Sequence, residues 1–119
     1  MGYLLRVLSV SAVLAIILYA GLRSAPIPQV FQHQDWLHHA AGFAALACVS
    51  RLAFPHTHLL WILLYCVLLA CSIELAQGLM PRRTASLDDM LANLLGVAMG
   101  VLSAQLIRRY CARFLPLRS

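Results

Sequence analysis

The chain has 119 residues, of which 62% are hydrophobic and 11% are charged, and its formal net charge is +5. A soluble domain is close to half apolar and about a quarter charged, so this chain lacks the polar surface that a water-exposed globule needs. The composition excludes a soluble enzyme, a nucleic-acid-binding module and a disordered chain, and it indicates a small integral membrane protein.

Four hydrophobic segments are long enough for transmembrane helices, each of which needs about 20 mostly apolar residues. Helix-breaking prolines separate them, at Pro26 and Pro28, at Pro55 and at Pro81. We therefore predict an all-α fold, a four-helix transmembrane bundle that forms one domain over the whole chain, residues 1–119. The predicted spans lie at about residues 3–22, 36–54, 59–80 and 88–107.

The first segment has an alternative interpretation as a signal peptide, with Arg6 as its charged n-region. Its apolar run, residues 7–22, is slightly long for that role. The nearest cleavage position, after Ala25, precedes Pro26, which signal peptidase tolerates poorly. A retained first helix is therefore the prediction.

The distribution of arginine predicts the orientation, because cytoplasmic flanks of membrane helices collect Lys and Arg. With four spans, the two termini share one side with the second connection, and this side carries six arginines against three on the other. The six are Arg6, Arg51, Arg108, Arg109, Arg113 and Arg118, and the three are Arg23, Arg82 and Arg83. We expect cytoplasmic termini and a multi-pass membrane protein.

Polar side chains fall at one depth on three of the predicted helices. Glu74 lies six residues before Met80, so a rise of about 1.5 Å per residue places it roughly 9 Å inside that end of its span. Asn93 lies five residues after Asp88, at a similar depth, and His39 lies four residues into its span. These positions predict a polar layer just beneath the outer face.

Further polar side chains share helix faces with this layer, because residues three or four apart are neighbours on a helix. The pairs are Asp35 with His39, Glu74 with Gln77, and Asp89 with Asn93. Ionisable groups are costly to bury in a membrane and by default mark functional sites. We take these residues as ligand-binding candidates. The alternative is that they hydrogen-bond one another and only lock the helices together.

Small residues near the layer predict close helix packing. Gly96 and Gly100 form a GxxxG pair on the fourth segment, and Gly42 lies among alanines on the second. Such residues let helix backbones approach closely.

Two arginines complete the candidate site. Arg82 and Arg83 lie in the last connection, beside the polar layer. We expect Arg83 to be a cationic partner for Glu74 or Asp89.

The motifs together form a composite pattern. It comprises Asp35-x-x-x-His39, Glu74-x-x-Gln77 and Arg83-Thr-Ala-Ser-Leu-x-Asp89-x-x-x-Asn93-x-x-Gly96-x-x-x-Gly100, and it covers most of residues 35–100. This arrangement resembles the VanZ-like family of small four-helix bacterial membrane proteins. The family commonly has Lys after the first Asp, where this chain has Trp36.

The resemblance implies a role in the bacterial cell envelope. The family is named after a member associated with resistance to the glycopeptide antibiotic teicoplanin, so antibiotic resistance is a function that the resemblance brings into consideration. Many relatives occur outside resistance clusters.

The leading hypothesis is an outer-leaflet site that binds an amphiphile or an envelope precursor by its polar head group. Arginine suits bidentate contacts with phosphate or carboxylate. The ligand-binding candidates are Asp35, His39, Glu74, Gln77, Arg82, Arg83, Asp89 and Asn93. The expected partners are membrane lipids and a lipid-linked ligand, without nucleic acid.

Three other roles stay open. A transferase or hydrolase acting on a lipid-linked substrate would use Glu74, Asp89 and His39 as catalytic acid and base residues. Ser86 is a conceivable nucleophile in such an enzyme, but we prefer it as the N-cap of the fourth helix, with Asp89 three residues on. A structural or partner-binding membrane subunit is the second role, and a conduit, which would require a homo-oligomer, is the third.

We expect no cofactor and no bound metal. His39, Glu74 and Asp89, with Asp35, could form a metal-ligand set, but a nearby Arg83 argues against a cation there.

Overall fold

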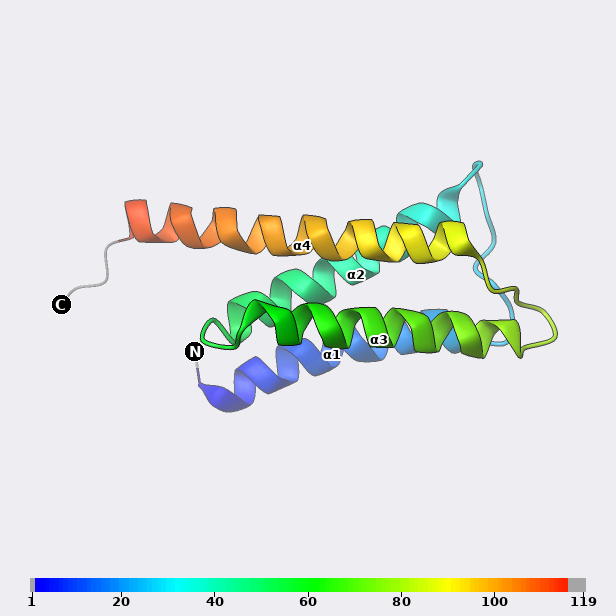
Figure 1. Ribbon diagram of the computed structural model, residues 1–119, viewed down its shortest axis with the longest axis horizontal. Helices are drawn as coiled ribbons and strands as arrows, with labels where there is room; N and C mark the ends of the chain where they lie inside the picture. The colour runs from blue at the N-terminus through cyan, green and yellow to red at the C-terminus, as the bar shows by residue number, and fades with distance from the viewer. Residues whose placement is uncertain (1, 116–119) are drawn as a thin grey trace.

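The computed structural model describes residues 2–115, and the chain there forms four α-helices without strands (Figure 1). They are α1 (Tyr3–Leu22), α2 (Gln34–Ala53), α3 (Leu59–Gly78) and α4 (Leu87–Phe114). The predicted all-α fold of four helices is therefore confirmed. Arg118, one of the arginines used to predict the orientation, lies outside the described residues.

Three of the helices in the described part of the chain, α1, α3 and α4, are long and apolar enough to cross a membrane. Twenty residues of helix are about 30 Å long, close to the thickness of the hydrocarbon layer. The second predicted span, α2, is not as apolar, because it contains Gln34, Asp35, His38, His39 and Arg51.

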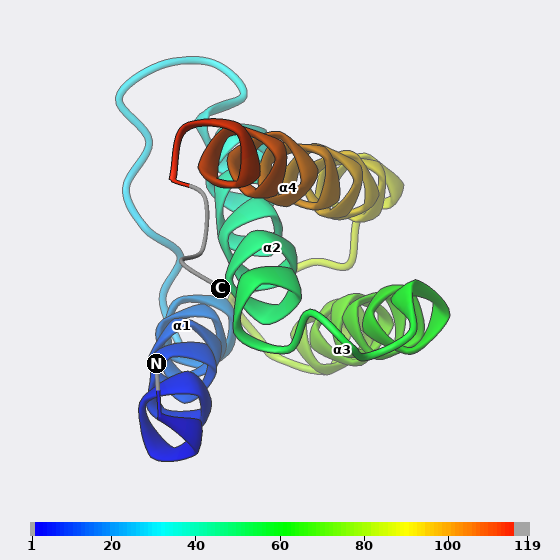
Figure 2. The same cartoon turned by 90° about the vertical axis from the view of Figure 1, so that its left-hand side faces the viewer.

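The polar helix α2 lies at the centre of the bundle. It packs against α1, α3 and α4, and its contact with α4 is the most extensive of all (Figure 2). The helices alternate in direction along the chain, so α2 and α4 run parallel to each other (Figure 1). The polar residues of α2 can therefore face neighbouring helices instead of the surroundings.

A small apolar core forms where the four helices meet. It includes Leu46 and Ala47 of α2, Cys66 and Ala70 of α3, and Val97 of α4. The outward faces of the helices are also apolar, and many of their large side chains are exposed. Examples are Leu60, Leu68, Leu75, Leu95 and Leu102. An apolar outer surface of this kind suits contact with lipid chains.

The α2–α4 contact is made between small residues. A Cβ atom placed on Gly96 would overlap the backbone carbonyl of Ala40, and one placed on Gly100 would overlap that of Ala44. The GxxxG pair of α4 thus lies directly against the backbone of α2. Gly42 faces the other way, toward α1, and a Cβ there would be 3.5 Å from Ile17 Cγ1, an ordinary contact.

The helix ends differ from the predicted span boundaries. Helix α2 begins at Gln34, so Asp35 lies in its first turn, and α3 ends at Gly78. The largest difference is in α4, which we expected to end near residue 107 and which continues to Phe114. The arginine-rich segment 108–114 contains no Pro or Gly, so nothing interrupts the helix until the approach to Pro116.

The glycines of α4 give a direct test of the close contact. We expect Gly96→Ala and Gly100→Ala each to lower the free energy of unfolding by about 1–3 kcal/mol, because the new methyl group overpacks against rigid backbone. Thermal unfolding in detergent, followed by tryptophan fluorescence, measures the effect.

Gly42→Ala is the matched control, because it adds the same methyl group where there is room. It should be neutral or stabilising by up to about 1 kcal/mol, since alanine is the better helix former. Equal destabilisation by all three substitutions would contradict the close α2–α4 contact.

Candidate functional site

The centre of the candidate site is His39, in the second turn of α2. Its ring lies between carboxylates from the two neighbouring helices. The distance from His39 Nδ1 to Glu74 Oε1 of α3 is 3.7 Å, and the distance from His39 Nε2 to Asp89 Oδ2 of α4 is 3.6 Å. Three helices therefore bring ionisable groups to one point.

Asn93 holds the His39 ring in place. It is fully buried, with 0% exposure, and its Oδ1 accepts a hydrogen bond of 2.9 Å from His39 Nδ1. Asn93 lies one turn before Gly96 on α4, so the close backbone contact at Gly96 also brings Asn93 against α2.

The segment that leads into α4 fixes the two carboxylates. Glu74 Oε2 accepts a hydrogen bond of 3.1 Å from the backbone N–H of Ser86, while the Ser86 hydroxyl accepts one of 3.3 Å from the backbone N–H of Asp89. The predicted N-cap role of Ser86 is thereby confirmed. Glu74 Oε1 and Asp89 Oδ1 are buried without a hydrogen-bond partner among residues 2–115.

Arg83 does not pair with a carboxylate, and our expectation that it would contact Glu74 or Asp89 is wrong. Its guanidinium donates instead to the backbone carbonyls of Ala20 at 2.9 Å and Gly21 at 3.0 Å. The last carbonyls of a helix have no partner within that helix, so the end of α1 attracts a cation. Gln77 Nε2 also donates to the Gly21 carbonyl, at 2.9 Å.

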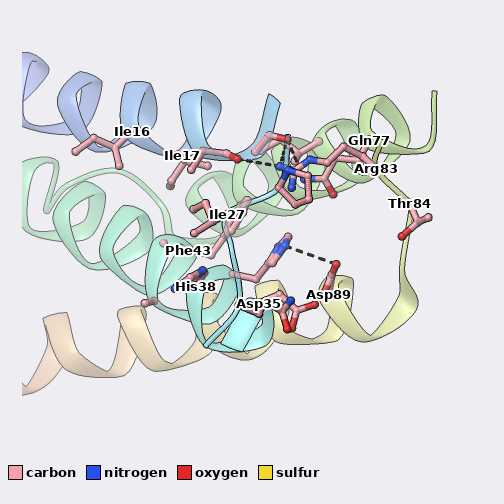
Figure 3. A pocket seen from close by; sticks show the side chains of 18 of the residues that line it. Ile16, Ile17, Ile27, Asp35, His38, Phe43, Gln77, Arg83, Thr84 and Asp89 are labelled. Atoms are coloured by element: carbon pink, nitrogen blue, oxygen red, sulfur yellow. Dashed lines mark hydrogen bonds and ion pairs between the residues drawn. The ribbon is translucent and has the colours of Figure 1, made fainter. Parts of the chain in front are cut away.

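His39 lines a cavity of about 530 Å³. Figure 3 shows other residues of the cavity wall, such as Ile17, Asp35 and Asp89. One part of its wall is apolar and comes from α1, α2 and the connection between them; it includes Ile16, Ile17, Ile27 and Phe43. The other part is polar. It is formed by Asp35, His38, His39, Gln77, Arg82, Arg83 and Asp89, together with Gln29 and Thr84.

The structure thus brings most of the sequence-predicted site residues to one end of the bundle. Six of the eight ligand-binding candidates line the cavity, and Glu74 and Asn93 lie behind them, in contact with or close to His39. The contribution of α1 to the cavity wall was not predicted. Its wall residues, such as Ile16 and Ile17, are the same types that face lipid, so the sequence carries no signal for them.

Comparison with known proteins identifies a family. A family model described as VanZ/LLP1 matches residues 3–108, which include α1, α2, α3 and most of α4. This match confirms the family resemblance that the motifs indicate. Comparison with curated proteins and with solved structures gives no match.

The contact between Asn93 and His39 predicts a large effect on stability. Asn93→Ala leaves the N–H of the half-buried His39 ring without its acceptor, and we expect a loss of about 1–3 kcal/mol in the free energy of unfolding. Ser103→Ala is the control on the same helix, because Ser103 is exposed and bonds only to Met99 of its own helix. Unfolding in bicelles measures both variants, and an Asn93→Ala loss no larger than that of the control contradicts the proposed restraint.

Proposed function

The chain belongs to the VanZ/LLP1 family, and we propose that it is a multi-pass protein of the bacterial inner membrane whose cavity binds the polar head group of an amphiphile or envelope precursor. One observation carries this proposal. A single cavity joins an apolar wall to an end lined by both arginines and hydrogen-bonding groups.

The composition of the cavity wall suits a molecule with a tail and a head. Ile16, Ile17 and Phe43 offer an apolar surface to an acyl or prenyl chain. Arg82 and Arg83 lie at the polar end, where a guanidinium group can hold phosphate or carboxylate oxygens in a bidentate contact. Arg82 is exposed, so its guanidinium is accessible to a ligand.

The arginine distribution supports an outer-leaflet position for the cavity. The start of α1 and the arginine-rich end of α4 lie at one end of the bundle (Figure 1). The cavity is lined by residues of the opposite helix ends, among them Asp35, Arg83 and Asp89. Arginine-rich ends of membrane helices face the cytoplasm. On this basis both termini are cytoplasmic and the head group enters from the outer side. The proposal includes a link to glycopeptide resistance of the teicoplanin type, which the family resemblance alone supports.

Binding of phosphatidylglycerol, compared with diacylglycerol of the same chains, tests the proposal. We expect native mass spectrometry of the detergent-solubilised protein to show preferential binding of phosphatidylglycerol. The double variant Arg82→Gln/Arg83→Gln should weaken that binding by about tenfold or more, since a charged contact contributes about 1.5–3 kcal/mol.

Arg23→Gln is the matched control, because Arg23 lies at the same end of the bundle but does not line the cavity. A second variant, Gly42→Leu, fills part of the apolar wall, and Ala45→Leu, on the exposed face of α2, is its control. Equal phosphatidylglycerol binding by the wild type and by both cavity variants would overturn the proposal.

A second candidate function is a transferase or hydrolase that acts on a lipid-linked substrate. The position of His39 between two carboxylates favours it, because a carboxylate can orient an imidazole for general acid or base work. His39 and Asp89 also line the cavity, so a bound head group can reach them.

Turnover separates the two functions. If the protein is an enzyme, His39→Gln should lower head-group release from a lipid phosphate by about 100-fold or more, while its binding of the same lipid stays nearly unchanged. Phosphate release from a polyprenyl phosphate is the measurement. If the wild type binds the lipid but releases no phosphate, the binding function is supported and the enzymatic function is excluded.

A further inference from the structure

We propose that His39, Glu74 and Asp89 bind a divalent transition-metal ion at the polar end of the cavity. Each residue offers one nitrogen or oxygen atom, and these three atoms lie within 4.8 Å of one another. One imidazole with two carboxylates is a donor set that suits ions such as Zn²⁺ and Mn²⁺.

The separation of His39 from Asp89 fits ligands that share an ion better than groups that contact each other. His39 Nε2 and Asp89 Oδ2 are 3.6 Å apart. A direct charge-assisted hydrogen bond would be about 2.7–2.9 Å long. Two ligands each about 2.1 Å from one ion, at an angle of about 110–120°, are separated by roughly 3.4–3.6 Å.

The burial of the carboxylates provides a second, independent observation. Glu74 is only 7% exposed and Asp89 only 8%. Glu74 Oε1 points toward the His39 ring, and both this atom and Asp89 Oδ1 have no hydrogen-bond partner in the described part of the chain. Once both are ionised, the two buried carboxylates carry a charge of −2, which a divalent cation would neutralise.

The hydrogen bonds around the cluster orient the donor atoms for a cation. Asn93 Oδ1 can only accept, so His39 Nδ1 carries the proton and the lone pair of a neutral ring lies on Nε2, the nitrogen that faces Asp89. Ser86 N–H in turn fixes Glu74 through Oε2 and leaves Oε1 free. Metal-binding histidines and carboxylates are commonly held by outer partners of this kind.

The position of Arg83 removes the main argument against a metal. We expected no metal because a guanidinium beside the carboxylates would repel a cation. Arg83 instead donates to the carbonyls of Ala20 and Gly21, and the described residues show no ion pair between it and either carboxylate. The only cation facing Glu74 and Asp89 in the described structure is His39, in its protonated form.

Three protein ligands leave at least one coordination position for another molecule. Because His39 and Asp89 line the cavity, that position is open to its contents. A head-group phosphate could complete the coordination, and this step alone rests on the proposed amphiphile binding. Metal binding by the three side chains does not depend on it.

Zn²⁺ binding to the full-length protein tests the proposal. After removal of metal with a chelator, we expect calorimetry and elemental analysis to give one Zn²⁺ per chain. His39→Gln, Glu74→Gln and Asp89→Asn, which nearly preserve side-chain shape, should each weaken binding by at least about tenfold. Asp88→Asn is the matched control for Asp89→Asn, because Asp88 is the exposed neighbour of Asp89 and does not line the cavity.

A spectroscopic measurement needs no substitution within the site. In the background His56→Gln/His58→Gln, which removes a second histidine pair from the α2–α3 connection, electron spin-echo spectra of the Cu²⁺-loaded protein should show one coordinated imidazole. No imidazole, or two, would overturn the proposal. It is also overturned if the wild type takes up no Zn²⁺, or if Zn²⁺ binding survives all three ligand substitutions.

Phosphatidylglycerol binding by the same metal-free and Zn²⁺-loaded samples separates the two proposals. If the protein binds phosphatidylglycerol but does not bind Zn²⁺, the metal site alone is overturned. Zn²⁺ binding without lipid binding supports the metal site and overturns the amphiphile function.

Discussion

The close approach of α2 and α4 is the constraint on which the rest of the structure depends. Gly96 and Gly100 leave no side chain between the two backbones, so Ala40 and Ala44 lie directly against α4. One turn away, the same approach brings Asn93 into hydrogen-bond contact with His39. A side chain larger than glycine at the contact would separate the helices and with them the polar groups. Gly96 and Gly100 therefore determine how close the polar groups of the site can come to one another.

In this bundle several polar side chains are buried, while apolar side chains form the core and cover the outward faces of the helices. Glu74, Gln77, Asp89 and Asn93 are all buried, while leucines cover the outward faces of α3 and α4. Burial of ionisable groups is costly in any protein, and a membrane removes water as an alternative partner. Backbone groups meet part of this cost, since Ser86 N–H binds Glu74 and the carbonyls at the end of α1 bind Arg83. The cavity beside His39 is where these polar groups meet the apolar wall of α1.

The sequence was sufficient to predict the helices and the polar layer, because both follow from local rules. Helix rise and the spacing of three or four residues relate Asp35 to His39 and Asp89 to Asn93 without any tertiary information. The partner of Arg83 could not be predicted in this way, because it depends on where the carbonyls at the end of α1 lie in space. The part of the cavity wall that α1 forms could not be predicted either, since isoleucine side chains face lipid as well as cavities. The predicted end of α4, at about residue 107, is too early, because the arginine-rich segment that follows contains no helix-breaking residue.

The polarity of the central helix has a consequence for biogenesis. A segment with Asp35, two histidines and Arg51 partitions less readily into lipid by itself than the three more apolar helices do. Its most extensive contact is with α4, which follows the other three helices along the chain. During synthesis α2 therefore lacks its main partner until the chain has been made as far as the second glycine of the GxxxG pair. Completion of the bundle is thus coupled to the synthesis of α4, and a nascent chain that stops short of this helix leaves the polar side chains of α2 without their main partner.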